Sequence, residues 1–213
     1  REAAGGPSAG PGGGLGGAAP GGAVPLGGWA HELPALEVGS LVLAAAGDHF
    51  ALSQQYLHKA VLLVIQHDDS GDVALILNRP SAYTTHDLLA ADEATAIGDT
   101  QGAWDVWYGG DCQGITDPGG VRMLFCLHNA EKLAGQSQEI LPGVFMTDFA
   151  GARELVGSGS AAKEDFVVLA GYCAWGPGHL QREVDRGDTW ALAAADPRSF
   201  FAGVPDVRAS RRA

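Results

Sequence analysis

Short apolar runs, separated by segments rich in glycine and polar residues, dominate most of the chain. Residues 39–45 form one such run, and residues 60–65 and 73–77 form two more that are rich in β-branched side chains. The loop at 67–72 contains Asp, Ser and Gly, which is typical of an antiparallel hairpin. The pattern predicts a first strand at 39–45 and a hairpin built from the two later runs.

Four later runs also predict strands. Residues 104–108 alternate in polarity, whereas residues 122–128 are apolar without strict alternation, as expected for a strand covered on both faces. Residues 140–146 and 166–172 are the other two candidates.

Proline and threonine signals mark the end of the hairpin and the start of a helix. Pro80 lacks the amide donor of a strand ladder, so the second hairpin strand is expected to end at residues 78–80. Thr84 can then cap a helix that continues to about residue 97.

Two further helices are predicted nearer the end of the chain. Thr147 can cap a short helix to residue 156, and a turn at 175–178 leads into a helix at 180–186 that Gly187 ends. Many strands, few helices and hairpin connections together predict an α+β fold with a mostly antiparallel sheet.

Composition divides the chain into three parts. Residues 1–28 are almost entirely Gly, Ala and Pro, and such a segment buries too little apolar surface to offset the entropy of ordering its backbone. Residues 29–205 suffice for one well-buried domain, and residues 206–213 are expected to form a flexible basic tail. We expect a disordered leader, one domain and a tail.

The charge disfavours direct nucleic-acid binding. A net charge of −12 and a pI near 4.8 oppose non-specific contact with phosphate backbones. Arg208, Arg211 and Arg212 form a basic cluster that is typical of a solvated tail. No apolar run approaches the roughly 20 residues that span a bilayer, so we expect a soluble protein without a membrane span.

The cysteines indicate neither a metal site nor a disulfide framework. Cys112, Cys126 and Cys173 are odd in number, widely spaced and form no CxxC pair. We therefore expect a reducing compartment and predict no metal and no cofactor.

Several motifs together resemble the YqgE/AlgH family, also known as DUF179. They are the Asn78-Arg79-Pro80 corner, the Gly109-Gly110 pair, the strand ending in Leu127-His128, and the Gly-Tyr-x-x-Trp-Gly-x-Gly-x-Leu series over residues 171–180. The matching segments occur in the family's order and cover roughly residues 39–200. Asp111-Cys112 and His179 depart from the residues that are usual in the family.

The resemblance implies a bifurcated β-sheet wrapped into a pseudo-barrel with flanking helices. Bacterial members have been linked to transcriptional regulation, but no biochemical activity is firmly attached to the family. The segment Trp29-Ala30-His31 resembles plant and algal members. This likeness implies the chloroplast stroma, with the cytoplasm as the alternative.

The segment 171–180 is the first candidate for binding. A strand enters a glycine-rich turn and a helix follows, so free amide groups at the turn could hold an anion. Close backbone packing is the competing interpretation, with Tyr172 and Trp175 filling the core. Arg79 could likewise bind an anion, or Asn78 and Arg79 could form a structural corner.

Two other groups could carry chemistry. Cys126 and His128 are two residues apart on a predicted strand and share one face, so a thiol activated by an imidazole is conceivable, although a buried cysteine is usually inert. His67, Asp68, Asp69 and Asp72 do not follow the spacing of a calcium loop and are expected to form a solvated turn.

These observations favour a non-enzymatic binding or regulatory module that engages a protein or a small anionic ligand at a glycine-rich surface groove. The alternatives are a small-molecule enzyme that uses Cys126 and His128, and a transcription-related regulator. The candidate ligand-binding residues are Asn78, Arg79, Gly109, Gly110, Gly171, Tyr172, Trp175, Gly176, Gly178 and His179.

Overall fold

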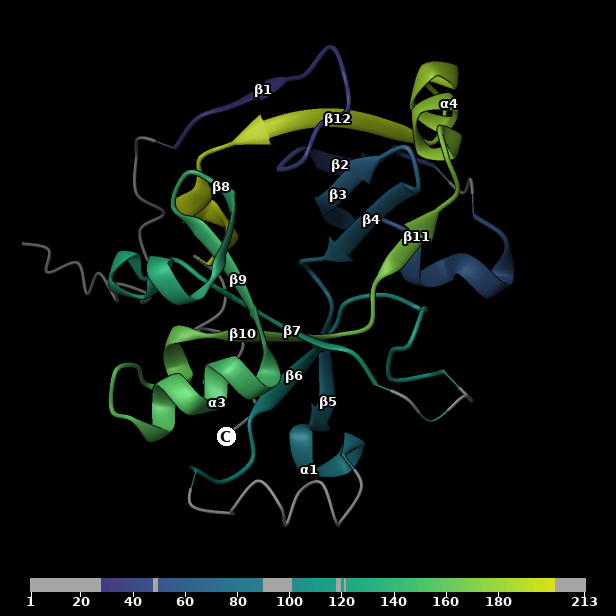
Figure 1. Cartoon of the computed structure of the whole chain (residues 1–213). Coiled ribbons are helices and arrows are strands. Elements are labelled where there is room, and N and C mark those ends of the chain that lie inside the picture. Colours follow the sequence, from purple (N-terminus) through teal and green to yellow (C-terminus); the bar gives the residue numbers. More distant parts are fainter. Residues whose placement is uncertain (1–27, 48–49, 90–100, 118–119, 121, 202–213) are drawn as a thin grey trace, which may run out of the picture.

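The computed structural model describes residues 28–47, 50–89, 101–117, 120 and 122–201 (Figure 1). Most of the predicted leader, the tail and residues 90–97 of the predicted helix after Thr84 lie outside these residues. The proposed division of the chain at residues 28 and 205 therefore stays a prediction.

The first sheet is antiparallel throughout and contains six strands. Their order is β1-β12-β2-β3-β4-β11. The bounds are β1 Ala30–Glu32, β12 Trp190–Ala195, β2 Leu41–Ala44, β3 Val61–Asp68, β4 Gly71–Ile76 and β11 Cys173–Trp175.

The second sheet also has six strands, in the order β5-β6-β10-β7-β9-β8. The bounds are β5 Pro80–Thr84, β6 Asp105–Tyr108, β10 Val167–Ala170, β7 Leu124–His128, β9 Val144–Asp148 and β8 Gln138–Leu141. β6 and β10 pair in parallel, and the other pairs are antiparallel. The predicted α+β fold is confirmed, with its strands divided between two sheets that do not close into a true barrel.

The helices in the described residues are short. The α-helices are α1 Thr85–Leu88, α3 Phe149–Gly157 and α4 His179–Arg186. The 3-10 helices are Leu52–Leu57, Glu131–Gln136, Lys163–Asp165 and Pro197–Phe200. Figure 1 shows α4 beside the first sheet and α3 beside the second.

The predicted hairpin is confirmed as β3 and β4, but the loop between them is shorter than expected. Most of residues 67–72 belong to the two strands, because Gly71 adopts a φ of +131° that permits a tight turn. A β-bulge lies between Val64 and Gln66. It changes which side chains of β3 face the second sheet.

Other elements differ from their predictions. The single strand expected at 140–146 is the pair β8 and β9, joined by a turn in which Gly143 has a φ of +82°. The cap of α3 is Asp148 rather than Thr147, since its carboxylate accepts a hydrogen bond from the Gly151 amide at 2.7 Å. The second hairpin strand, β4, ends at Ile76, just before the predicted residues 78–80. Pro80 begins β5, an edge strand of the second sheet, where no amide donor is needed.

Three apolar clusters hold the elements together. One lies on the face of the first sheet that α4 covers and includes Leu180 and Trp190. A second lies between the two sheets and includes Leu63 and Leu169, and a third packs α3 against the second sheet. The chain passes from one sheet to the other between β10 and β11, through Gly171 and Tyr172 (Figure 1).

Candidate ligand-binding site

Three of the candidate glycines meet where the chain crosses between the sheets. A Cβ on Gly110 would lie 2.0 Å from the backbone carbon of Tyr172, and a Cβ on Gly109 would lie 2.3 Å from the carbonyl oxygen of Gly171. Gly171 itself has a φ of +78°. The Gly109 carbonyl accepts from the Ile76 amide at 2.9 Å, which links the two sheets. This glycine crossing, formed by Gly109, Gly110 and Gly171, leaves no space for a ligand at their α-carbons.

Asn78 and Arg79 fasten a corner. Asn78 accepts from the Val61 amide at 3.0 Å and donates to the Lys59 carbonyl at 2.9 Å. Arg79 donates to the carbonyls of His58 and Asn78. The described geometry thus gives both side chains a structural role, as in the corner interpretation, and their part in ligand binding stays a prediction.

Trp175 belongs to a small aromatic cluster under α4. Its indole nitrogen donates to Glu183 Oε2 at 3.3 Å, and the Trp190 indole donates to the same oxygen at 2.9 Å. The two rings meet edge to face, 6.3 Å apart. One carboxylate on α4 therefore ties the helix to β11 and β12.

The turn before α4 is open to solvent. Gly176, Gly178 and His179 are exposed, and Gly178 has a φ of +66°. A Cβ on Gly178 would lie 3.2 Å from a guanidinium nitrogen of Arg182. The predicted anion contact at this turn therefore has a cation beside it.

A cleft of about 480 Å³ opens between the two sheets, beside the glycine crossing. It contains one candidate residue, Tyr172, together with residues of β3, β4, β7, β8 and β9 that sequence reasoning missed. We call it the inter-sheet cleft; its lining residues are Ile65, Gln66, Asp68, Val73, Met123, Phe125, Gln138, Met146 and Tyr172.

Apolar and polar groups share the walls of this cleft. Phe125 and Tyr172 meet edge to face with ring centres 6.1 Å apart. Met123 and Met146 are the two methionines of the chain, and both line the cleft. Methionine side chains adapt their shape to irregular ligands, so this surface is suited to binding.

The rim on the β3 side is held by a hydrogen-bond network. Gln66 Nε2 donates to Ser70 Oγ at 3.0 Å, and the Ser70 amide donates to Asp68 Oδ1 at 2.7 Å. The hydrogen bonds from Ser70 lower the pKa of the exposed Asp68 carboxyl below its ordinary value. Asp68 is therefore ionised at neutral pH and fixed in place.

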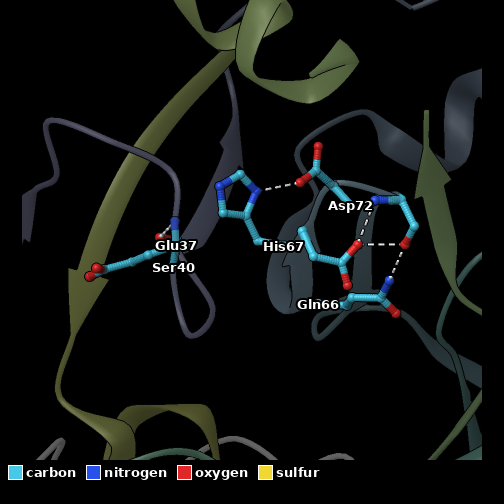
Figure 2. Close-up of polar contacts among 7 residues, drawn as sticks. Glu37, Ser40, Gln66, His67 and Asp72 are labelled. Carbon is cyan, nitrogen blue, oxygen red and sulfur yellow. Dashed lines mark hydrogen bonds and ion pairs between the residues drawn. The ribbon is translucent and has the colours of Figure 1, made fainter. Parts of the chain in front are cut away.

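His67 adjoins Gln66 and Asp68 in sequence but is not among the residues that line the cleft. Figure 2 shows its ring turned toward Asp72. The His67 Nδ1 lies 2.6 Å from Asp72 Oδ1. Asp72 is only 2 % exposed, so the expectation of a wholly solvated turn is wrong at this residue.

Cys126 and His128 are both fully buried on β7. His128 Nδ1 accepts from the Ala130 amide at 3.3 Å, and its Nε2 lies 2.8 Å from Ser137 Oγ. An accepting Nδ1 requires the proton on Nε2, so both nitrogens are already used. Burial raises the pKa of the Cys126 thiol and lowers the pKa of His128. This geometry gives the thiol no available base.

The other two cysteines lie in a polar cluster around Asp111. Burial, and next the negative charge of Asp111, raise the pKa of the thiols of Cys112 and Cys173. Burial and a hydrogen bond to Asp111 raise the pKa of Tyr56, whose ring lies 5.6 Å from that of Tyr108. Because the thiolate is the reactive form, thiols with raised pKa values are poor nucleophiles at neutral pH.

The described residues form neither a candidate metal site nor a membrane-spanning helix. They contain no group of three or more His, Cys, Asp or Glu side chains placed to hold a metal ion. Within the same part of the chain, no helix is long and apolar enough to cross a bilayer.

The sequence model of the AlgH-like (DUF179) family matches residues 45–210. A UPF0301 protein of Xanthomonas euvesicatoria is 28% identical over 158 residues, which cover 74% of this chain and 79% of that protein. A UPF0301 protein of Chlorobium luteolum is 28% identical over 178 residues, which cover 81% of this chain and 82% of that protein.

Two solved structures resemble the fold. The solution structure of AlgH from Pseudomonas aeruginosa has a TM-score of 0.55 at 21% identity, covering 85% of this chain and 91% of that one. The crystal structure of DIP2367 from Corynebacterium diphtheriae has a TM-score of 0.50 at 17% identity, covering 78% of this chain and 80% of that one. At these identities the likeness concerns the fold alone.

Proposed function

The chain belongs to the AlgH-like (DUF179) family, and we propose that it is a non-enzymatic binding module that holds its ligand in the inter-sheet cleft. The single observation that carries this proposal is the cleft itself. It offers about 480 Å³ in the size range of ligand pockets, and adaptable and hydrogen-bonding side chains share its lining. Tyr172, a residue of the Gly-Tyr motif, forms part of that lining.

The rival enzyme hypothesis has less support. It needs Cys126 as a reactive thiolate and His128 as its base, but both side chains are fully buried. The hydrogen bonds of His128 to Ala130 and Ser137 already occupy its ring nitrogens. A binding role requires none of these groups to react.

A regulatory role would fit a protein partner better than nucleic acid. The net charge of −12 opposes contact with phosphate backbones, and the nine residues that line the cleft include no Lys or Arg. For a small anionic ligand the turn before α4 is the better place, since Arg182 lies beside Gly178.

Methyl labelling tests the proposal, because the chain's two methionines both report on the cleft. The full chain is labelled with 13C at the methionine methyl groups and mixed with small-molecule and protein fractions of its native cells. We expect one fraction to shift both resonances, and Tyr172→Leu to remove the shift. Tyr83→Leu is the matched control, because Tyr83 is 47% exposed and does not line the cleft.

Two results would contradict the proposal. One is that no fraction moves either methionine resonance. The other is turnover of a substrate that Cys126→Ala abolishes while Tyr172→Leu leaves it intact. In a separate arm sulfate is added to the 15N-labelled chain, and an unchanged Gly178 amide resonance would discard the anion contact at the α4 turn.

The compartment stays a prediction from the resemblance of Trp29-Ala30-His31 to plant and algal members. This resemblance favours the chloroplast stroma over the cytoplasm. Imaging of the tagged full-length protein in its own cells decides between them, and exclusion from plastids would discard the first.

A further inference from the structure

We propose that the inter-sheet cleft binds an arginine side chain presented by an extended peptide segment of a protein partner. This inference rests on the proposed binding function and names its partner chemistry. It is argued from the charge, the aromatic groups and the hydrogen-bond acceptors of the cleft.

The charge of the lining is negative. Asp68 is its one ionised residue, and none of the nine described residues that line the cleft is Lys, Arg or His. Two basic residues adjoin the lining residues in sequence. His67 Nδ1 lies 2.6 Å from Asp72 Oδ1, and Arg122 Nη1 donates to the Asp117 carbonyl at 3.0 Å. Asp69 and Glu139 adjoin the lining residues Asp68 and Gln138 and are exposed. A cation is therefore attracted here and an anion is repelled.

The apolar part of the lining suits a long cationic side chain. Arginine buries its alkyl stem along apolar surface while its guanidinium stays at a polar rim. Phe125 and Tyr172 supply aromatic rings on which a guanidinium can stack, and Met123 and Met146 supply contacts for the stem. An ammonium or a neutral apolar group would use only part of this surface.

The polar rim matches the donors of a guanidinium. Gln66 uses one of its two amide N–H donors on Ser70, and its amide oxygen can accept a hydrogen bond from a ligand. Asp68 is fixed by Ser70, and Gln138 lies opposite on β8. A guanidinium carries five N–H donors and no acceptor, so it complements a rim of oxygen atoms.

An extended peptide is the source that the edge strand beside the cleft favours. The cleft is lined by six segments, which come from both sheets and from the crossing between them, so several residues of a peptide can contact it. Gln138 is on β8, an edge strand of the second sheet, whose outer backbone groups pair with no other described strand.

Three blocked peptides test the proposal on the full-length chain labelled at its methionine methyl groups. They are acetyl-Ala-Ala-X-Ala-Ala-amide with arginine, its neutral isostere citrulline, or glutamate at X. We expect saturable shifts of both methionine resonances with the arginine peptide, binding at least fivefold weaker with citrulline, and no shift with glutamate. At about 1 M salt the affinity of the arginine peptide should fall, because the screening length drops to about 3 Å.

A matched pair of variants locates the charge. Asp68→Asn should weaken the arginine peptide about threefold to fivefold, as for an exposed ion pair, and it keeps the oxygen that accepts from Ser70. Asp69→Asn removes the same charge one residue away, outside the lining, and should change the affinity less than twofold.

Each other outcome overturns part of the proposal. Equal binding of the citrulline peptide would discard the cationic ligand but leave a binding cleft, whereas shifts with none of the peptides would discard the arginine site. If arginine amide alone binds as tightly as the peptide, the ligand is a small molecule. If replacing Arg208, Arg211 and Arg212 by Gln shifts the methionine resonances without peptide, the occupant is the chain's own basic segment.

Discussion

At the scale of single residues, the glycine motifs of this chain act by their lack of a side chain. Gly110 is the clearest case, because any Cβ there would lie 2.0 Å from the Tyr172 carbon and 2.2 Å from its oxygen. The neighbouring atoms are backbone and cannot turn aside. The Gly-Gly motif is therefore required for the crossing between the sheets.

Replacing Gly110 by Ala should accordingly lower the free energy of unfolding by about 3 kcal/mol or more, the upper range for overpacking. Denaturant titration of the purified variant measures this. Gly135→Ala is the control, since a Cβ there meets no atom within 4 Å, and it should be neutral or slightly stabilising. Equal stability of both variants would show that the crossing tolerates a side chain.

At the scale of elements, α4 depends on one carboxylate. Glu183 accepts from the indole nitrogens of Trp175 and Trp190, which lie on two different strands. Leu180, on the same helix, is fully buried against the first sheet. The helix is thus attached by one apolar and one polar anchor.

Glu183→Ala should lower the free energy of unfolding by about 2 kcal/mol, because it leaves the buried Trp190 donor without its acceptor. Glu183→Gln keeps one side-chain oxygen as an acceptor and should lower the free energy of unfolding by a smaller amount. Denaturant titration and tryptophan emission measure both effects. Glu154→Ala on the exposed side of α3 serves as the control, and a similar loss in that variant would contradict the role given to Glu183.

Elements with strong local signals could be predicted from the sequence. The hairpin of β3 and β4 has two apolar runs and a polar loop, and the α4 region has a glycine turn before it and Gly187 after it. β1, β5 and β12 were missed because their strand character comes from pairing with distant partners. Ala30 pairs with Ala195, and neither has a side chain that signals a strand.

The inter-sheet cleft could not be predicted because long-range pairing assembles it. Gln138 and Met146 face each other across β8 and β9, in a segment predicted as a single strand. The bulge after Val64 places Ile65 and Gln66, neighbours in sequence, in the same lining. Strict alternation would have put them on opposite faces. Tyr172 could be predicted as a candidate because the residues of its motif are close together in sequence.

At the scale of the whole molecule, the two sheets share one core. Leu169 of β10 is fully buried in the same cluster as Leu63 of β3, and the Ile76 amide bonds across to Gly109. Without the other sheet, each sheet would therefore expose one apolar face to solvent. We expect the described strands to unfold as a single cooperative unit.

Leu169→Ala tests this unit. The cavity that this substitution leaves in the shared core should lower the free energy of unfolding by about 3 kcal/mol. Native-state hydrogen exchange should show that loss equally in the amides of β3 and of β7, although Leu169 lies in the second sheet only. Loss of protection confined to the second sheet would mean that the sheets unfold separately.

The glycine crossing also affects how a partner would bind, because it fixes part of the cleft in advance. Cys112 exchanges backbone hydrogen bonds with Tyr172 at 2.9 and 3.1 Å, and Gly110 packs against the same peptide. The backbone of this cleft-lining tyrosine is therefore held in place before a partner binds. A receptor already in its final shape spends no free energy on rearrangement. Its association rate then depends on diffusion and orientation rather than on a rare open state, so weak partners can exchange rapidly.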